Sequence, residues 1–145
     1  MSSFVHPLSY GEIANHSERL HQRLGQAWQL LEKNPHQASQ AAREVEHLAR
    51  TVGDNRAWAD GLFIWAVGSL YAADAPEAIT LASRALAVYR FLGHPQGQWS
   101  CLSLIAAAWR YLGDARQAQE SHRQAAFVLE NASFEQRAIW LKWFK

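Results

Sequence analysis

Apolar residues recur at intervals of three and four along most of the chain, which is the spacing of one face of an α-helix. The first such stripe consists of Leu20, Leu24, Ala27 and Leu31. No segment alternates between apolar and polar residues with a period of two, and β-branched residues are sparse. The pattern therefore predicts an all-α protein.

Proline, glycine and short acidic or amide residues interrupt the stripes and divide the chain into helices. The predicted helices cover about residues 17–33, 36–52, 55–73, 75–92, 95–112 and 115–131, and a seventh begins at Ser133 and reaches Lys145. We therefore expect an irregular lead-in over residues 1–16, helical repeats over 17–131, and a C-terminal helix over 132–145 that acts as a cap, an interface or the start of a linker.

The helices repeat with a fixed period. Alanines lie forty residues apart at positions 38, 78 and 118, and the loops before them carry Asn34, Asp74 and Asp114 at the same interval. A period of this length is typical of stacked repeats, in which each unit is one helix pair. A single pair cannot bury both of its apolar faces, so about three units are needed to form a continuous core.

The second and third units carry matching residues in their two helices. The third unit reads Leu102-x2-Ile105-Ala106-x2-Trp109, then Ala118-x3-His122 and Ala125, and the second reads Leu62-x2-Trp65-Ala66-x2-Ser69, then Ala78-x3-Ala82 and Ala85. These units resemble tetratricopeptide repeats (TPRs), whose usual pattern is Trp-x2-Leu-Gly-x2-Tyr followed by Ala-x3-Phe and a further Ala. The first unit departs from the pattern, with Gly25 and Gln26 where the second has Trp65 and Ala66.

The resemblance implies an α-solenoid of about three TPR-like helix pairs plus a C-terminal capping helix. The forty-residue period is similar to that of TPR domains with extended helices, which are found in bacterial signalling and regulatory proteins. Such domains bind partners, so the resemblance implies a protein–protein interaction or sensory scaffold, placed in the N-terminal regulatory part of a longer bacterial signalling protein.

Composition excludes several other classes of function. The 145-residue chain has a formal net charge of +1 and no run of Lys or Arg, so nothing attracts nucleic acid or an anionic membrane. The longest uncharged stretch, residues 61–73, is too short to cross a bilayer, and the start lacks the layout of a signal peptide. The one cysteine, Cys101, allows no intrachain disulfide. We expect a soluble, cytoplasmic protein.

Catalytic and metal-binding signals are weak. The seven histidines are dispersed, and none has the spacing of a zinc site. The sequence contains no glycine-rich phosphate loop and no Gly-x-Ser-x-Gly elbow. We therefore expect no enzymatic activity, no cofactor and no metal.

The resemblance places a ligand groove on the first helix of each unit, which lines the concave face of a TPR array. Carried over by position, the groove residues are Asp60, Phe63, Val67, Leu70, Tyr71, Ser100, Ser103, Ala107, Arg110 and Tyr111. This surface is apolar and lacks the Lys and Asn set with which chaperone-binding TPR domains hold a terminal carboxylate. The expected partner is an amphipathic helix or hydrophobic segment of a protein or peptide; the alternative is that neighbouring helices partly cover these residues.

The seven tryptophans are numerous for this length. Trp65 and Trp109 occupy positions that predict a place in the core, whereas Trp58 and Trp99, near the starts of first helices, fit either the core or a binding edge.

The C-terminal helix is predicted to be apolar over more than half of its circumference, through Ile139, Trp140, Leu141, Trp143 and Phe144. A capping helix normally has a polar outer face, so this surface predicts an interface. Three explanations fit: the chain continues into a longer protein, the helix folds back over the groove, or a homodimer forms through Ile139, Trp140, Trp143 and Phe144.

Two alternatives to the scaffold function follow from the same residues. One is a stand-alone protein that self-associates through its C-terminal aromatic residues. The other is a small-molecule sensor in which Phe63, Tyr71, Arg110 and Tyr111 surround an apolar ligand in the concave groove.

Overall fold

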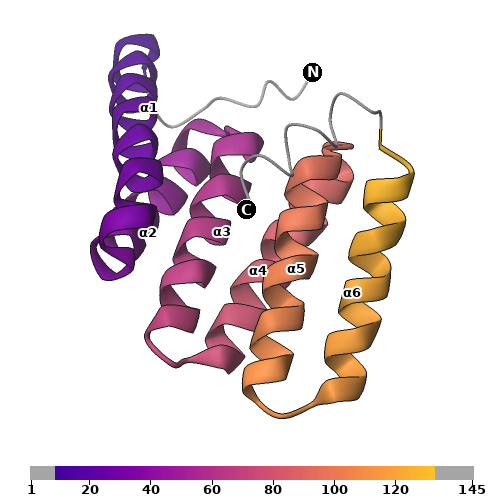
Figure 1. Cartoon of the computed structure of the whole chain (residues 1–145). Helices are drawn as coiled ribbons and strands as arrows, with labels where there is room; N and C mark the ends of the chain where they lie inside the picture. Colours follow the sequence, from indigo (N-terminus) through magenta and orange to yellow (C-terminus); the bar gives the residue numbers. More distant parts are fainter. Residues whose placement is uncertain (1–8, 133–145) are drawn as a thin grey trace.

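The computed structural model describes residues 9–132, which form six helices (Figure 1). They are α1 Tyr10–Lys33, α2 Pro35–Val52, α3 Asn55–Tyr71, α4 Ala75–Phe91, α5 Pro95–Tyr111 and α6 Ala115–Glu130. Each helix packs against the next one along the chain, and α3 also contacts α1 and α5. The prediction of an all-α array of helix pairs is confirmed for this part of the chain, and the predicted C-terminal helix lies outside the described residues.

The helix starts follow a simple rule. The residue before each helix is Ser9, Asn34, Asp54, Asp74, His94 or Asp114, and its side chain accepts a hydrogen bond from the backbone N–H three residues later. This capping satisfies a donor that the helix itself leaves without a partner. From Asn34 onward the caps recur every twenty residues. The forty-residue period is therefore two helices of nearly equal length.

The helix ends follow the same interval. The backbone takes the left-handed conformation at Gly53, Gly93 and Gly113, and also at Ala73, where φ is 63°. Glycine adopts this conformation without a steric penalty, whereas a residue with a Cβ is disfavoured by about 1–2 kcal/mol. The turn after α3 is thus built like the others but carries some strain.

The first helix corrects the expected lead-in. Helix α1 begins at Tyr10, so residues 10–16 are helical rather than irregular. The side chain of Ser9 accepts a hydrogen bond from the N–H of Glu12 at 3.2 Å, and Glu12 places a negative charge in the first turn, where the helix dipole favours it. This stretch has few apolar residues, so hydrophobic periodicity did not reveal the helix.

The core is made largely of small residues. Most alanines of α2, α3, α4 and α5 are buried, including Ala66 and Ala106, which occupy equivalent positions in the second and third units. Helices α2 and α3 are closely packed at Gly68, where an added Cβ would lie 2.5 Å from the Cβ of Ser39. Small side chains therefore allow the backbones of these two helices to come into near contact.

The tryptophans surround this core. Trp58, Trp65, Trp99 and Trp109 are all partly buried and pack against the main cluster. The indole N–H of Trp58 donates to the Glu46 carboxylate at 3.2 Å. The core placement expected for Trp65 and Trp109 is confirmed in part, because each ring packs on the core and keeps some exposure.

An ion-pair cluster joins α1 to α2. The Glu44 carboxylate accepts from Arg19 at 2.5 Å and from Arg23 at 2.8 Å. Partial burial alone would raise the pKa of Glu44, but the two guanidinium groups together lower it.

Among residues 9–132, every helix is too short or too polar to span a lipid bilayer.

Candidate ligand groove between α3 and α5

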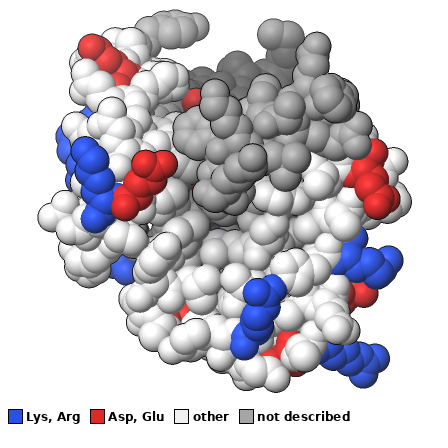
Figure 2. Space-filling view, viewed as in Figure 1, with Lys and Arg blue, Asp and Glu red and all other residues white. Residues whose placement is uncertain are grey.

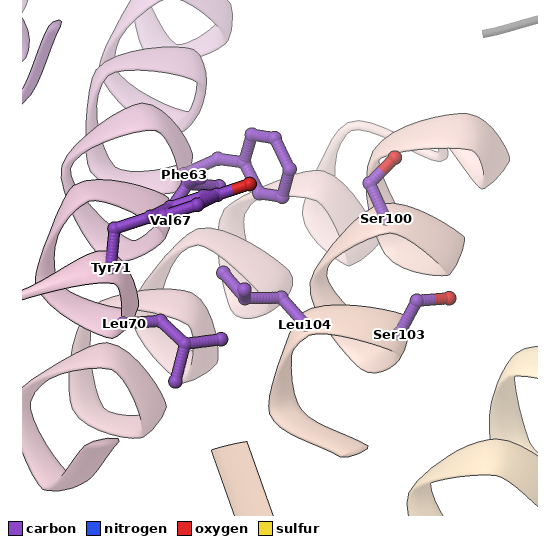
Figure 3. Close-up of a pocket in the computed structure, with 7 residues that line it drawn as sticks. All are labelled: Phe63, Val67, Leu70, Tyr71, Ser100, Ser103 and Leu104. Carbon is purple, nitrogen blue, oxygen red and sulfur yellow. The ribbon is translucent and has the colours of Figure 1, made fainter. Parts of the chain in front are cut away.

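A pocket of about 550 Å³ opens between α3 and α5 (Figure 3). Its residues come from these two helices: Phe63, Val67, Leu70, Tyr71, Ser100, Ser103 and Leu104. The four residues of α3 are spaced at i, i+4, i+7 and i+8, so they form one face of that helix. We call this pocket the α3–α5 groove.

The α3–α5 groove is apolar with a polar edge. Phe63 is only 5% exposed, whereas Tyr71 at the end of α3 is 74% exposed. The Ser100 hydroxyl donates to the Gln96 carbonyl at 2.9 Å, so its one donor is already used within the helix. Among the described residues, none that lines the groove is charged. On the face shown in Figure 2, charged side chains lie mainly towards the margins of the described surface.

The aromatic surface extends from the groove towards α1. The ring of Trp28 lies 6.1 Å from that of Phe63 between centroids, at an interplanar angle of 38°. Trp28 is 40% exposed. Because α1 packs beside α3, this tryptophan adds apolar surface next to Phe63, outside the pocket lining.

Six of the ten residues predicted for the groove line it, namely Phe63, Val67, Leu70, Tyr71, Ser100 and Ser103. Leu104 also lines it and was not predicted. Its position one residue after Ser103 is next to the predicted stripe, but spacing alone did not show that α5 turns this side towards α3. Trp28 of the first unit was one of the seven tryptophans counted in the sequence, but no position in the fold was predicted for it.

Three of the remaining predicted residues lie away from the pocket lining. Ala107 is half-buried on α5, and Tyr111 is 62% exposed at the end of that helix. Arg110 is exposed and pairs with the ring Nε2 of His122 on α6. Phe63 and Tyr71 therefore line the same pocket, whereas Arg110 and Tyr111 lie outside it. The four residues do not surround one small-molecule site as the sequence had suggested.

Asp60 is placed differently from the prediction, because it is buried at 7% exposure. Its Oδ1 accepts hydrogen bonds from the hydroxyl of Tyr89 on α4 and from Nε of Arg56, the latter at 3.3 Å. Burial raises the pKa of Asp60, although the Tyr89 hydroxyl and the Arg56 guanidinium oppose the rise. Asp60 fixes α3 to α4 and is not available to a ligand in the groove.

The surroundings of Tyr89 are tightly packed. Its ring stacks on His94 at 5.3 Å between centroids, and a Cβ added to Gly97 would meet it at 2.3 Å. Burial lowers the pKa of His94, which fits its role as an acceptor, because its Nδ1 accepts the N–H of Gly97 at 2.9 Å. Burial also changes the pKa of the Cys101 thiol, which it raises.

Within residues 9–132, no three or more His, Cys, Asp or Glu side chains are grouped so that they could hold a metal ion.

The chain matches no protein-family model and no curated protein sequence. It is similar to a solved structure, the crystal structure of the TPR domain of Arabidopsis FLU, with a TM-score of 0.75 and 19% sequence identity. The similarity covers 81% of this chain and 99% of that one. The chain has the TPR fold. The predicted TPR-like α-solenoid is therefore confirmed, and in this TPR array the α3–α5 groove lies between the first helices of the second and third units.

Proposed function

We propose that the chain is a protein–protein interaction scaffold, and that the α3–α5 groove binds an amphipathic helix or hydrophobic segment of a partner protein. The observation that carries this proposal is an open apolar groove without charged lining residues, built on a TPR fold. An exposed apolar surface of this kind usually marks an interaction site, because leaving it in water is unfavourable.

The shape of the groove favours a helical ligand. Its two walls, α3 and α5, are the first helices of successive units, and their side chains leave a trough between them (Figure 3). A helix with apolar residues at i, i+3 or i+4 and i+7 would present one stripe to such a trough. Burying one Leu or Phe side chain there would contribute about 1.5–3 kcal/mol. Affinity would come from apolar contact rather than from charge, so it should depend little on salt.

The wider setting that we propose is the regulatory part of a longer bacterial signalling protein in the cytoplasm, with no catalytic role of its own. Support for this setting is the extended, forty-residue repeat, which the twenty-residue spacing of the helix caps reproduces. In such a setting, occupancy of the α3–α5 groove would report the presence of the partner.

The proposal is tested by selecting helical peptides from a phage-displayed library on the full chain. The binding of enriched peptides is then measured by isothermal titration calorimetry against two variants. Ser103→Arg places a large charged side chain in the groove, and Ser83→Arg makes the same change on an exposed position of α4.

We expect amphipathic peptides to be enriched. Ser103→Arg should weaken their binding about tenfold or more, the equivalent of about 1.4 kcal/mol, while Ser83→Arg should leave their binding unchanged. Affinity should change little with added salt, because an exposed charge pair would be screened and an apolar contact would not. Enriched peptides that bind both variants equally would show that the ligand site is elsewhere.

A further inference from the structure

The stretch that follows the described helices has the chemistry expected of a ligand for the α3–α5 groove. Within residues 133–145 the sequence carries Ile139, Trp140, Trp143 and Phe144, at the spacing i, i+1, i+4 and i+5. This spacing puts the four side chains on one face of a helix. The basic residues Arg137, Lys142 and Lys145 are interspersed among them.

The described helices bring this stretch close to the groove. Helices α5 and α6 pack side by side and are joined by a short turn, so the end of α6 at Glu130 lies at the same end of the array as the start of α5 at Pro95 (Figure 1). From that end, Ser100 and Ser103 are about 8–12 Å along α5 at 1.5 Å per residue. The sideways step across one helix is about 8–10 Å.

The chain is long enough to cover this distance. The seven residues from Ala132 to Ile139 can span up to roughly 23 Å when extended, which exceeds the combined path along and across α5, so the docked helix would begin near Ile139 rather than at Ser133. The residues from Ile139 onward would then lie over the groove.

We propose that residues 133–145 dock in the α3–α5 groove of their own chain. The aromatic face of Ile139, Trp140, Trp143 and Phe144 packs on Phe63, Val67, Leu70 and Leu104, and the basic residues remain in water. This inference rests on the proposed function, because it assigns an intramolecular competitor to the same partner site. A partner then binds only by displacing the C-terminal segment.

The tether makes such competition effective. A short connection gives the segment an effective concentration on the order of millimolar at the groove. Even a weak intrinsic affinity then keeps most molecules closed, and the apparent affinity for a partner falls by the fraction that remains open. The C-terminal segment would therefore set the threshold at which a partner is bound.

The decisive experiment uses a fluorescein-labelled synthetic peptide with the sequence of residues 133–145 as the probe, and fluorescence anisotropy as the readout. It is titrated with the full wild-type chain and with the full-length double variant W140E/W143E, whose own segment is weakened. The matched control is K142E, which changes the net charge by the same two units outside the aromatic face.

We expect the probe to bind W140E/W143E about tenfold or more tightly than wild type, as displacement of a tethered competitor requires. The control variant should behave as wild type, and adding Ser103→Arg to W140E/W143E should abolish binding. Equal affinity for wild type and W140E/W143E, or binding to neither, would overturn the intramolecular docking.

The peptides selected from the library separate this failure from failure of the proposed function. If they bind wild type and W140E/W143E equally, and Ser103→Arg still weakens them, the groove is a partner site without a tethered competitor. If none of them depends on Ser103 in either protein, the partner site itself is misassigned.

A second measurement distinguishes docking within one chain from exchange between two. A spin label on Tyr111→Cys, at the exposed end of α5 beyond the pocket lining, in a Cys101→Ala background, should broaden the indole N–H signals of Trp140 and Trp143 in the same molecule, and a label on Ser83→Cys should not. Broadening that appears only when labelled and isotope-enriched chains are mixed would show a swapped dimer and overturn the proposal.

Discussion

Helix α3 has two apolar faces that are packed in different ways. On the face towards α2, an added Cβ on Gly68 would lie 2.5 Å from Ser39, and one on Gly61 would lie 3.0 Å from Val45. On the face towards α5, Tyr71 is 74% exposed at the edge of a pocket of about 550 Å³. One face has no room for a methyl group, and the other has room for a ligand.

Side-chain volume explains the difference better than hydrophobicity does. Glycine, alanine and serine let the α2 and α3 backbones approach closely, whereas Phe63, Val67 and Leu104 stand between α3 and α5. Close-packed helices exclude ligand and solvent, and helices separated by large side chains leave grooves where the packing is incomplete. The close packing of the array and the α3–α5 groove thus lie on different faces of one helix.

The largest effect is expected on the closed face. Gly68→Ala should destabilise the chain by about 1–3 kcal/mol, because the new Cβ forces α2 and α3 apart. Gly25→Ala is the matched control, since an added Cβ in α1 meets nothing within 4 Å. It should instead stabilise by up to about 1 kcal/mol through helix propensity. Urea denaturation compares the two variants, and a stabilising effect of Gly68→Ala would contradict the tight contact.

The contact between α3 and α4 should come next. Tyr89→Phe removes the hydroxyl that donates to the buried Asp60 carboxylate, and should cost about 1–2 kcal/mol because a buried acceptor loses a partner. Tyr111→Phe removes a hydroxyl from a residue that is 62% exposed and should be neutral. Thermal unfolding followed by circular dichroism measures both, and equal effects would show that the Asp60–Tyr89 bond contributes nothing.

The pH dependence of stability tests the same carboxyl group. Burial raises the pKa of Asp60, so the folded state holds this proton more tightly than the unfolded chain does. The resulting stabilisation is complete below the ordinary Asp pKa of about 4 and is lost as the pH rises through the higher folded-state pKa. The unfolding free energy of wild type minus that of Asp60→Asn should therefore fall as the pH rises above about 4. A difference that rises with pH would mean that the paired Arg56 lowers the pKa instead.

The smallest effect on stability is expected on the open face. Tyr71→Ala should change the free energy of unfolding by less than about 0.5 kcal/mol, because the side chain is mostly in water. The same change should weaken the binding of the peptides selected from the library, since it removes apolar surface from the wall of the α3–α5 groove. A large loss of stability, measured by urea denaturation, would place Tyr71 in the core rather than at the groove.

Part of the site was predictable from local pattern. The i, i+4, i+7 and i+8 spacing of Phe63, Val67, Leu70 and Tyr71 is set by the helix, and the TPR resemblance chose the face of α3 that lines the pocket. Asp60 lies three residues before Phe63 and was assigned to the same face, but its carboxylate bonds to Tyr89 of the next helix. A partner 29 residues away cannot be inferred from spacing within one helix.

The sequence by itself determined the all-α fold and the forty-residue repeat, because periodicity and turn preferences are local properties of the chain. It missed the start of α1 at Tyr10, where a polar first turn depends on the Ser9 cap instead of apolar periodicity. Only the tertiary structure decided that Gly68 closes one face of α3, and that Trp28 and Leu104 extend the other. These features depend on the distances between helices, and side chains from several helices set those distances together.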